Sequence, residues 1–251
     1  YEMLRSLVGS EMCIRDSPKG QQELMKAVLN TGKPVIVCNF TGSAMNLSLA
    51  EEKADAVIQA WYPGARGGRA IADLLFGKES PSGKLPITFY KDLEGMPEFT
   101  DYSMKNRTYR YMEKEALYPF GYGLTYSDTC VTEAEVVGEV SAESDIVLKA
   151  TVKNNGTVDT DEVVQVYIKD LDSPLAVRNY SLCGFKRVSL KAGEEKSVEF
   201  TISNKAMNIV DEDGNRYIAG KHFRLFAGVS QPDTRSAELT GHKPAEVEIA
   251  L

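Results

Sequence analysis

The residues best suited to chemistry lie in one glycine-rich stretch. Gly64, Gly67 and Gly68 precede a run with helical spacing, and Arg66 and Arg69 add positive charge there. Backbone N–H groups at a helix N-terminus can hold a phosphate group. The spacing matches neither G-x-G-x-x-G nor G-x-x-x-x-G-K-[ST]. A tight turn is therefore the favoured interpretation, and a nucleotide site is the alternative.

Two side chains near this turn are candidate substrate-binding residues. Trp61 is the only tryptophan, and its indole could stack on the apolar face of a sugar. It ends an apolar stretch, however, which favours a place in the core. Arg66 lies at a helix start, where arginines are more often solvated or paired with carboxylates than bound to ligands. We carry both forward as rim candidates and assign no catalytic, cofactor-binding or metal-binding residue.

Other titratable residues have simpler explanations. Four carboxylates of the first half are explained as helix surface charges or helix caps, so none is assigned to catalysis. They are Glu51, Glu52, Asp55 and Asp73. His222 lies in an alternating stretch, which favours a surface or hydrogen-bonded strand histidine, and His242 lies in a polar tail. Residues 211–215 read Asp-Glu-Asp-Gly-Asn but lack the twelve-residue calcium pattern, so a turn is expected.

The four cysteines show no zinc-like or C-x-x-C spacing. They are interpreted as free thiols rather than as a disulfide framework, and they are Cys13, Cys38, Cys130 and Cys183.

Hydrophobic periodicity predicts the elements that position these residues. In chain order the expected elements are a helix over 20–29, a strand over 35–40, a helix over 47–53, a strand over 54–61, a helix from Gly67 to a stop at Gly77, and a strand over 85–89. This order indicates an α/β sheet. The run at 35–40 is continuously apolar, as in strands buried on both faces. Ligands of such sheets bind outside the carboxyl ends of the strands, so the loops over 39–43 and 62–68 are of interest.

The second half of the chain reads as all-β. Stretches of alternating hydrophobicity separated by turn signals predict strands over 147–153, 162–169, 183–190, 196–202, 215–218 and 222–229. About seven strands without a long helix indicate a β-sandwich. The fold class is therefore α/β with Rossmann-like layers, followed by an all-β sandwich.

Composition excludes several kinds of partner. The 251 residues carry a net charge of −7 and a pI near 5.1, which argues against nucleic acid. No apolar run approaches the roughly 20 residues that span a bilayer, so no membrane partner is expected. No cofactor is expected either. The sequence leaves open the cellular compartment and whether the chain forms a homodimer.

The first seventeen residues lack periodicity and do not read as a signal peptide, because charged residues interrupt their apolar stretches. Residues 7–17 resemble an in-frame translation of a sequencing adapter. We interpret 1–17 as a non-native, adapter-derived tail, with an ordinary disordered tail as the alternative.

Two motifs carry a resemblance to a known family. Residues 63–77 read Pro-Gly-x-x-Gly-Gly-x-Ala-Ile-Ala-Asp-x-Leu-Phe-Gly, with Pro-Ser-Gly-Lys-Leu-Pro at 81–86, and residues 118–126 read Tyr-Pro-Phe-Gly-Tyr-Gly-Leu-Thr-Tyr. Both resemble the C-terminal α/β domain of family 3 glycoside hydrolases, the β-glucosidase and β-xylosidase group. Residues 163–229 resemble the fibronectin type III-like domain of many family 3 enzymes. The aromatic run at 118–126 is expected to be an aromatic lock pinned by burial.

The resemblance implies four segments: the tail 1–17, an α/β portion over 18–126, a fibronectin type III-like sandwich over 127–240 and a tail over 241–251. It also implies a retaining β-glycosidase acting on terminal glucosyl or xylosyl groups of an oligosaccharide or an aryl or alkyl β-glycoside. In relatives the nucleophilic aspartate lies on an N-terminal (β/α)8 barrel, and the acid/base glutamate lies upstream of the helix at residue 20. Neither region is expected in this chain, so the chain alone is expected to be inactive.

Two departures and one alternative remain. Arg66 stands where relatives commonly have glutamate, and Cys183 stands where they usually have lysine. The alternative function is a non-catalytic module that binds carbohydrate or protein, or a structural module.

Overall fold

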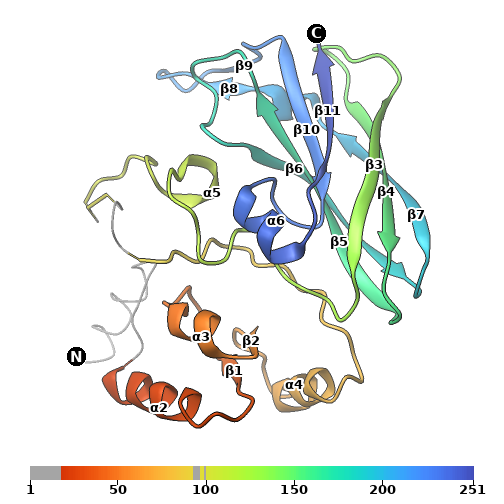
Figure 1. Cartoon of the computed structure of the whole chain (residues 1–251). Helices are drawn as coiled ribbons and strands as arrows, with labels where there is room; N and C mark the ends of the chain where they lie inside the picture. Colours follow the sequence, from red (N-terminus) through yellow and green to blue (C-terminus); the bar gives the residue numbers. More distant parts are fainter. Residues whose placement is uncertain (1–17, 93–96, 99) are drawn as a thin grey trace. The chain divides into compact units, whose positions relative to one another are not determined.

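The structure is a computed structural model that describes residues 18–92, 97–98 and 100–251 (Figure 1). It divides into two compact units. The α/β unit comprises the described residues up to 79, together with those of 87–103 and 114–118. The sandwich unit comprises 80–86, 104–113 and 119–251. The expected boundary near residue 126 therefore differs from the one in the structure, because three short segments before it fold with the sandwich.

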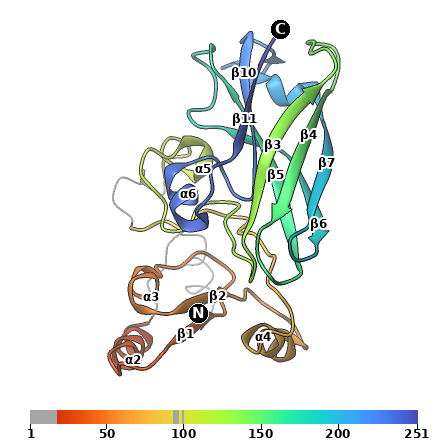
Figure 2. The ribbon, with the colours of Figure 1, turned by 45° about the vertical axis from the view of Figure 1, so that its right-hand side comes forward.

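The α/β unit contains a small parallel sheet and its helices. Its elements are α2 (Lys19–Leu29), β1 (Ile36–Asn39), α3 (Ser48–Lys53), β2 (Ala56–Gln59) and α4 (Gly67–Leu75). Strands β1 and β2 pair in parallel. Within this unit α2 and α3 lie on one side of the two strands and α4 lies on the other (Figures 1 and 2). The expected α/β class is confirmed.

Two expectations for this unit were wrong. The stretch 85–89 is not a strand; of its residues only Phe89 forms an isolated bridge, to Tyr118. Pro86 supplies no amide hydrogen for a longer ladder, which explains the interruption. Strand β1 is not buried on both faces either, since Ile36 is 49% exposed. The described part of this sheet has only two strands, and a sheet of two strands has little buried interior.

Two sheets form the sandwich. One sheet has the strand order β11-β10-β5-β6 and the other has the order β3-β4-β7. The bounds are β3 (Thr129–Val137), β4 (Ile146–Asn154), β5 (Thr160–Asp170), β6 (Ser181–Leu190), β7 (Glu195–Ile202), β10 (His222–Gly228) and β11 (Ala245–Ala250). Every pairing is antiparallel. The expected β-sandwich is confirmed.

Alternation of side chains builds the sandwich core. The core lies between the two sheets and contains fully buried side chains from both. Examples are Leu148 and Val152 of β4 from one sheet, and Val164 of β5 and Phe223 of β10 from the other. Fully burying such a side chain contributes about 1.5–3 kcal/mol relative to leaving it exposed. The core explains why these alternating stretches could be identified from the sequence.

Smaller elements complete the unit. They are α5 (Thr108–Tyr111), the 3-10 helix η1 (Asn204–Met207), β8 (Ile209–Val210), β9 (Arg216–Tyr217) and α6 (Thr234–Thr240). The turn between β8 and β9 is the acidic run. Asp211 Oδ1 accepts from the amides of Asp213 and Asn215, and Gly214 has a φ of 83°. No helix among the described residues is long and apolar enough to cross a membrane.

Residues 245–250 do not form a tail. They form the edge strand β11, which pairs with β10 from His222 opposite Ala250 to Ala227 opposite Ala245. Ile249 of β11 is buried in the core. The alternation in this strand is short, and the charges of Glu246 and Glu248 make it read as polar.

We expect Ile249→Ala to lower the free energy of unfolding by about 2–5 kcal/mol, because it removes buried methyl groups and leaves a cavity. Leu251→Ala, at an exposed position one strand end away, should change it by less than about 0.5 kcal/mol. Urea titration of both variants measures this. Equal stability of the two variants would show that β11 is not part of the folded sandwich.

Candidate functional site

The carboxyl ends of β1 and β2 are joined by side-chain amides. Asn39 Nδ2 donates to Gln59 Oε1 at 2.6 Å, and Gln59 Nε2 donates to the carbonyl of Thr41 at 3.1 Å. Thr41 Oγ1 in turn donates to the carbonyl of Ser43 at 2.8 Å. The loop over 39–43 is therefore held by hydrogen bonds among its own residues and with Gln59 of β2.

Trp61 has a strained backbone that packing offsets. Its φ is 53°, a left-handed conformation that costs a bulky residue about 1–3 kcal/mol. Its ring packs edge to face with Phe89 at a centroid distance of 6.2 Å, and the side chain is half-buried. Trp61 thus packs on a buried ring without being fully buried itself, and its role as a sugar platform stays a prediction.

Tyr62 is the exposed aromatic residue at this edge. Its side chain is 81% exposed, and a Cβ at Gly42 would lie 2.4 Å from its ring. Gly42 thus lets the Tyr62 ring lie against the loop, and a side chain there would make the exposed ring move. The sequence analysis missed Tyr62, although its position directly after a strand end was a usable signal.

Arg66 is exposed, and it precedes the first residue of α4. It makes no ion pair with a described residue, whereas Arg69 pairs with Asp73 at 3.4 Å. The glycines have conformational reasons: Gly64 has a φ of 71°, and a Cβ at Gly67 would lie 2.5 Å from Pro63. These constraints support the tight-turn interpretation of the glycine-rich stretch.

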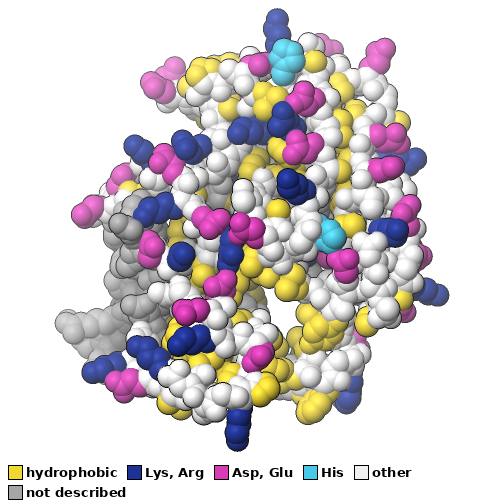
Figure 3. Space-filling view, viewed as in Figure 1, with side chains coloured by type: hydrophobic (Ala, Val, Ile, Leu, Met, Phe, Trp, Pro, Cys, Tyr) yellow, Lys and Arg dark blue, Asp and Glu magenta, His cyan; other side chains and the backbone are white. Residues whose placement is uncertain are grey.

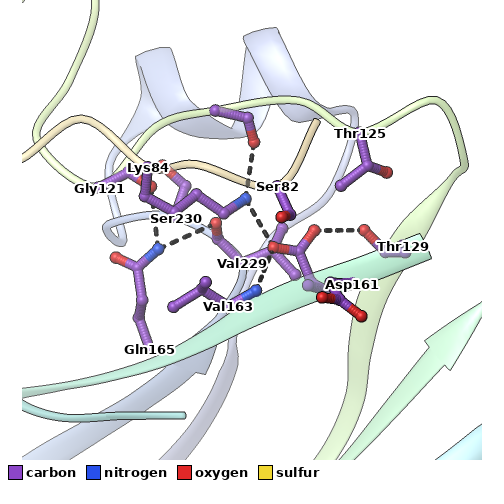
Figure 4. A network of polar contacts seen from close by, with 12 residues as sticks. Ser82, Lys84, Gly121, Thr125, Thr129, Asp161, Val163, Gln165, Val229 and Ser230 are labelled. Carbon is purple, nitrogen blue, oxygen red and sulfur yellow. Dashed lines mark hydrogen bonds and ion pairs between the residues drawn. The ribbon is translucent and has the colours of Figure 1, made fainter. Parts of the chain in front are cut away.

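A polar network in the sandwich unit centres on Lys84 (Figure 4). Lys84 Nζ lies 2.7 Å from Glu162 Oε1 and donates to the carbonyl of Gly123 at 2.6 Å. Glu162 also accepts from Thr129 Oγ1 and from the amide of Val163, both at 2.6 Å. The side chains of Lys84 and Glu162 are only 8% and 2% exposed. This is a buried ion pair whose two charges are both hydrogen-bonded.

A second set of contacts holds the 119–126 segment on β5. Gln165 Nε2 donates to the carbonyls of Gly121 at 2.9 Å and Val229 at 3.2 Å. Tyr167 Oη donates to Gln165 Oε1 at 2.6 Å. Gly121 has a φ of 77°, and a Cβ at Gly123 would lie 2.1 Å from the carbonyl of Gly83. Close approach therefore explains Gly121 and Gly123 of the second motif.

Residues 80–82 are fixed by a third set. Ser80 Oγ lies 2.8 Å from Thr160 Oγ1, and Arg187 Nη2 donates to Ser82 Oγ at 2.5 Å. Arg187 Nε also pairs with Asp161 at 2.8 Å. The Ser189 hydroxyl and the Arg187 guanidinium hold the pKa of Asp161 below its usual range. Thr160 of β5 and Arg187 of β6 thus hold Ser80 and Ser82.

Aromatic contacts supplement these polar ones. Phe120 stacks on Tyr109 at a centroid distance of 4.3 Å, and Tyr180 packs edge to face with Tyr167 at 5.5 Å. Burial raises the pKa of Tyr109, Tyr167 and Tyr180. Within this unit the 119–126 segment is therefore held by the stacked ring of Phe120 and by hydrogen bonds from Gln165 and Lys84 to its carbonyls. Leu124 and Tyr126 are exposed.

The histidines and Cys183 have structural surroundings. His222 Nδ1 lies 2.9 Å from Asp172 Oδ2, as expected for a hydrogen-bonded strand histidine. His242 pairs with Asp128 and is not simply solvated. Cys183 is the extra residue of a bulge in β6, and its thiol donates to the carbonyl of Val166. Burial raises the pKa of that thiol to about 12, so it is a poor nucleophile.

Hydrogen bonds lower the pKa of four described carboxyl groups, which are those of Asp161, Asp172, Glu194 and Asp211. A glycosidase acid needs a raised pKa, so none of these four suits that role. Among the described residues no group of three or more His, Cys, Asp or Glu could hold a metal ion.

Family models match both parts of the chain. Residues 9–126 match the glycosyl hydrolase family 3 C-terminal domain, and residues 162–231 match the fibronectin type III-like domain. The first match begins inside the segment 1–17, which lies outside the described residues. The chain belongs to glycoside hydrolase family 3.

Relatives and solved structures agree. A xylan 1,4-β-xylosidase from Xylanibacter ruminicola is 40% identical over 235 residues, which are 92% of this chain and 27% of the relative. A β-glucosidase structure from Kluyveromyces marxianus has a TM-score of 0.80 at 28% identity and covers 94% of this chain and 29% of its own. A family 3 β-glucosidase structure from Bifidobacterium adolescentis has the same TM-score and identity, with 36% of its chain covered. The chain thus spans about a third of these proteins.

We expect Lys84→Met to lower the free energy of unfolding of the sandwich by about 3–5 kcal/mol, because Glu162 is left buried without its cation. The double variant Lys84→Met/Glu162→Leu should recover most of this loss, since no buried charge remains. Lys149→Met, at an exposed lysine of β4, is the control. Urea titration of the set checks this, and equal effects of Lys84→Met and Lys149→Met would contradict it.

The lowered pKa of Asp161 predicts a pH dependence. Its ionised form is stabilised in the folded state, so its contribution is full above the unfolded pKa of about 4 and is lost as the pH falls through the lower folded pKa. The stability difference between the wild type and Asp161→Asn should therefore be constant from about pH 5 to 7 and shrink below about pH 4. Urea titrations across that range measure it. A stability difference that grows on acidification would contradict the lowered pKa of Asp161 in the folded state.

Proposed function

We propose that this chain serves as the non-catalytic C-terminal part of a retaining β-glycosidase that removes terminal β-xylosyl or β-glucosyl groups. The observation that carries the proposal is the 40% identity to the Xylanibacter ruminicola β-xylosidase over 92% of the chain. A second β-xylosidase, from Formosa agariphila, is 32% identical over 228 residues. β-Xylosides are therefore the first substrates to test.

The described residues supply reasons for a non-catalytic role. Retention requires a nucleophile and an acid/base carboxyl about 5–5.5 Å apart, and the acid needs a raised pKa. The pKa of Asp161, Asp172, Glu194 and Asp211 is lowered, because these carboxyl groups are hydrogen-bonded to amides, hydroxyls or cationic side chains. The family resemblance puts the nucleophile and the acid/base residue upstream of the region that the relatives share with this chain. We infer that those residues act in the part of the relatives that has no counterpart here.

We infer in addition that the strand ends of the α/β unit form a rim of the substrate site. Ligands of parallel α/β sheets bind outside the carboxyl ends of the strands. Tyr62 is exposed there, Trp61 is half-buried beside it, and Arg66 follows in the same loop. An exposed phenol ring suits a sugar face better than the packed indole does.

Hydrolysis of 4-nitrophenyl β-D-xyloside and β-D-glucoside tests the proposal. The chain alone should release no 4-nitrophenol. A fusion of residues 18–251 to the Xylanibacter ruminicola enzyme, in place of the region that matches, should hydrolyse at least one substrate. The intact relative is the positive control. Turnover by the purified chain would overturn the non-catalytic role, and an inactive but folded fusion would overturn the glycosidase assignment.

A further inference from the structure

The turn between β4 and β5 combines a chemically labile dipeptide with a packing constraint. Asn155 is followed there by Gly156, and this is the only Asn-Gly pair in the 251 residues. Asparagine is among the thermolabile residues of proteins. Its lability depends on the residue that follows it, on the freedom of its side chain and on the mobility of the backbone around it.

The fold requires a glycine at position 156. A Cβ there would lie 2.2 Å from Ser127 Oγ, 3.0 Å from the amide nitrogen of Asp128 and 3.2 Å from Ser127 Cα. The hydroxyl group can rotate away, whereas the two backbone atoms can move only if the chain that leads into β3 moves with them. Glycine also leaves the amide nitrogen of residue 156 sterically open to a neighbouring carbonyl carbon.

The side chain of Asn155 is exposed and weakly held. Its Nδ2 donates to Cys130 Sγ at 3.3 Å, and a thiol sulfur is a weak acceptor. The backbone amide of Asn155 donates to the carbonyl of Asp128 at 2.7 Å. The backbone is therefore fixed at this residue, while the carboxamide is free to rotate.

The neighbouring Asn154 controls access to the amide of Gly156. Asn154 is fully buried, and its Oδ1 accepts from Ser127 Oγ at 2.5 Å and from the Gly156 amide at 3.0 Å. The latter bond has to open before the nitrogen of residue 156 can react. Residues 155 and 157–159 are all exposed, so opening this turn uncovers little apolar surface and costs less free energy than global unfolding.

We propose that Asn155 is a site of spontaneous deamidation in the folded protein. When the turn opens, the amide nitrogen of Gly156 loses its proton to solvent and attacks Asn155 Cγ. The new C–N bond closes a five-membered succinimide, and ammonia leaves. Water then cleaves one of the two C–N bonds of the ring: cleavage at Cγ leaves aspartate, and cleavage of the original peptide bond leaves isoaspartate. Overall, one water is consumed and one ammonia is released.

The two products have different consequences for the turn. Each adds one negative charge to the net charge of −7. Acidic and basic side chains are intermixed on the face of the molecule seen in Figure 3, so one more exposed charge is a small change. Isoaspartate also adds a backbone carbon between residues 155 and 156. The amides of these residues then cannot both keep their bonds to Asp128 and Asn154, so this product should loosen the turn.

Peptide mapping by mass spectrometry, after incubation of the whole chain at mildly alkaline pH, tests the proposal. The peptide that contains Asn155 should gain about 1 Da, because an amino group is exchanged for a hydroxyl group. Fragment ions assign the change to Asn155 rather than to Asn154. Asn30 is the internal control, since it is exposed but precedes threonine, and it should change more slowly.

The same incubation in urea gives the rate for the unfolded chain. A change at Asn155 in urea but not in the folded chain would overturn the proposal, because the fold would then protect the turn. No change in either condition would refute the lability of the pair itself.

Two substitutions test the steps separately. Asn155→Ser should abolish the mass change and leave the melting temperature unaltered, because the side chain is exposed. Protein isoaspartyl methyltransferase should label the incubated wild type but not this variant. Gly156→Ala should lower the melting temperature by roughly 5 °C, because its Cβ crowds the backbone at residues 127 and 128. An unaltered melting temperature of Gly156→Ala would contradict the requirement for glycine.

Discussion

The sandwich unit depends on one buried charge pair, Lys84 with Glu162. Moving two charges out of water costs several kcal/mol for each ion, and their attraction offsets this only when every remaining hydrogen-bonding group is used. Here the carbonyl of Gly123, the hydroxyl of Thr129 and the amide of Val163 complete the set. While Glu162 lies buried there, a cation carried by the segment at 80–86 is needed beside it, and this ion pair ties the segment to β5.

This constraint changes how the family motifs are understood. Lys84 and the glycines at 121 and 123 belong to the family motifs, yet the contacts around them are those of packing, since both glycines permit a close approach and the lysine pairs with a buried carboxylate. Surfaces open to a ligand lie elsewhere, at the strand ends that expose Tyr62. The motifs therefore identify the protein through its architecture rather than through its chemistry.

Sequence reasoning succeeded where the signal is local and failed where a distant partner decides. The helix at α4 and the alternating strands β4 and β5 follow from side-chain periodicity and glycine stops. Strand β11 was missed because its alternation includes Glu246 and Glu248, whose surroundings depend on Arg224 of the neighbouring strand. The positive φ of Trp61, the exposure of β1 and the partner of Lys84 each depend on residues far along the chain, which spacing alone does not reveal.

The most direct test of the central claim is native-state hydrogen exchange at two motif amides. The amide of Leu85 donates to the carbonyl of Tyr122 at 2.9 Å, and that of Gly121 donates to the carbonyl of Leu85 at 2.8 Å. If the motif segments fold as part of the sandwich, both amides should open with the same free energy as the core amides of β5. Exchange at Leu85 and Gly121 that is fast while the β5 core stays protected would show that the segments are only loosely attached, and would contradict the claim.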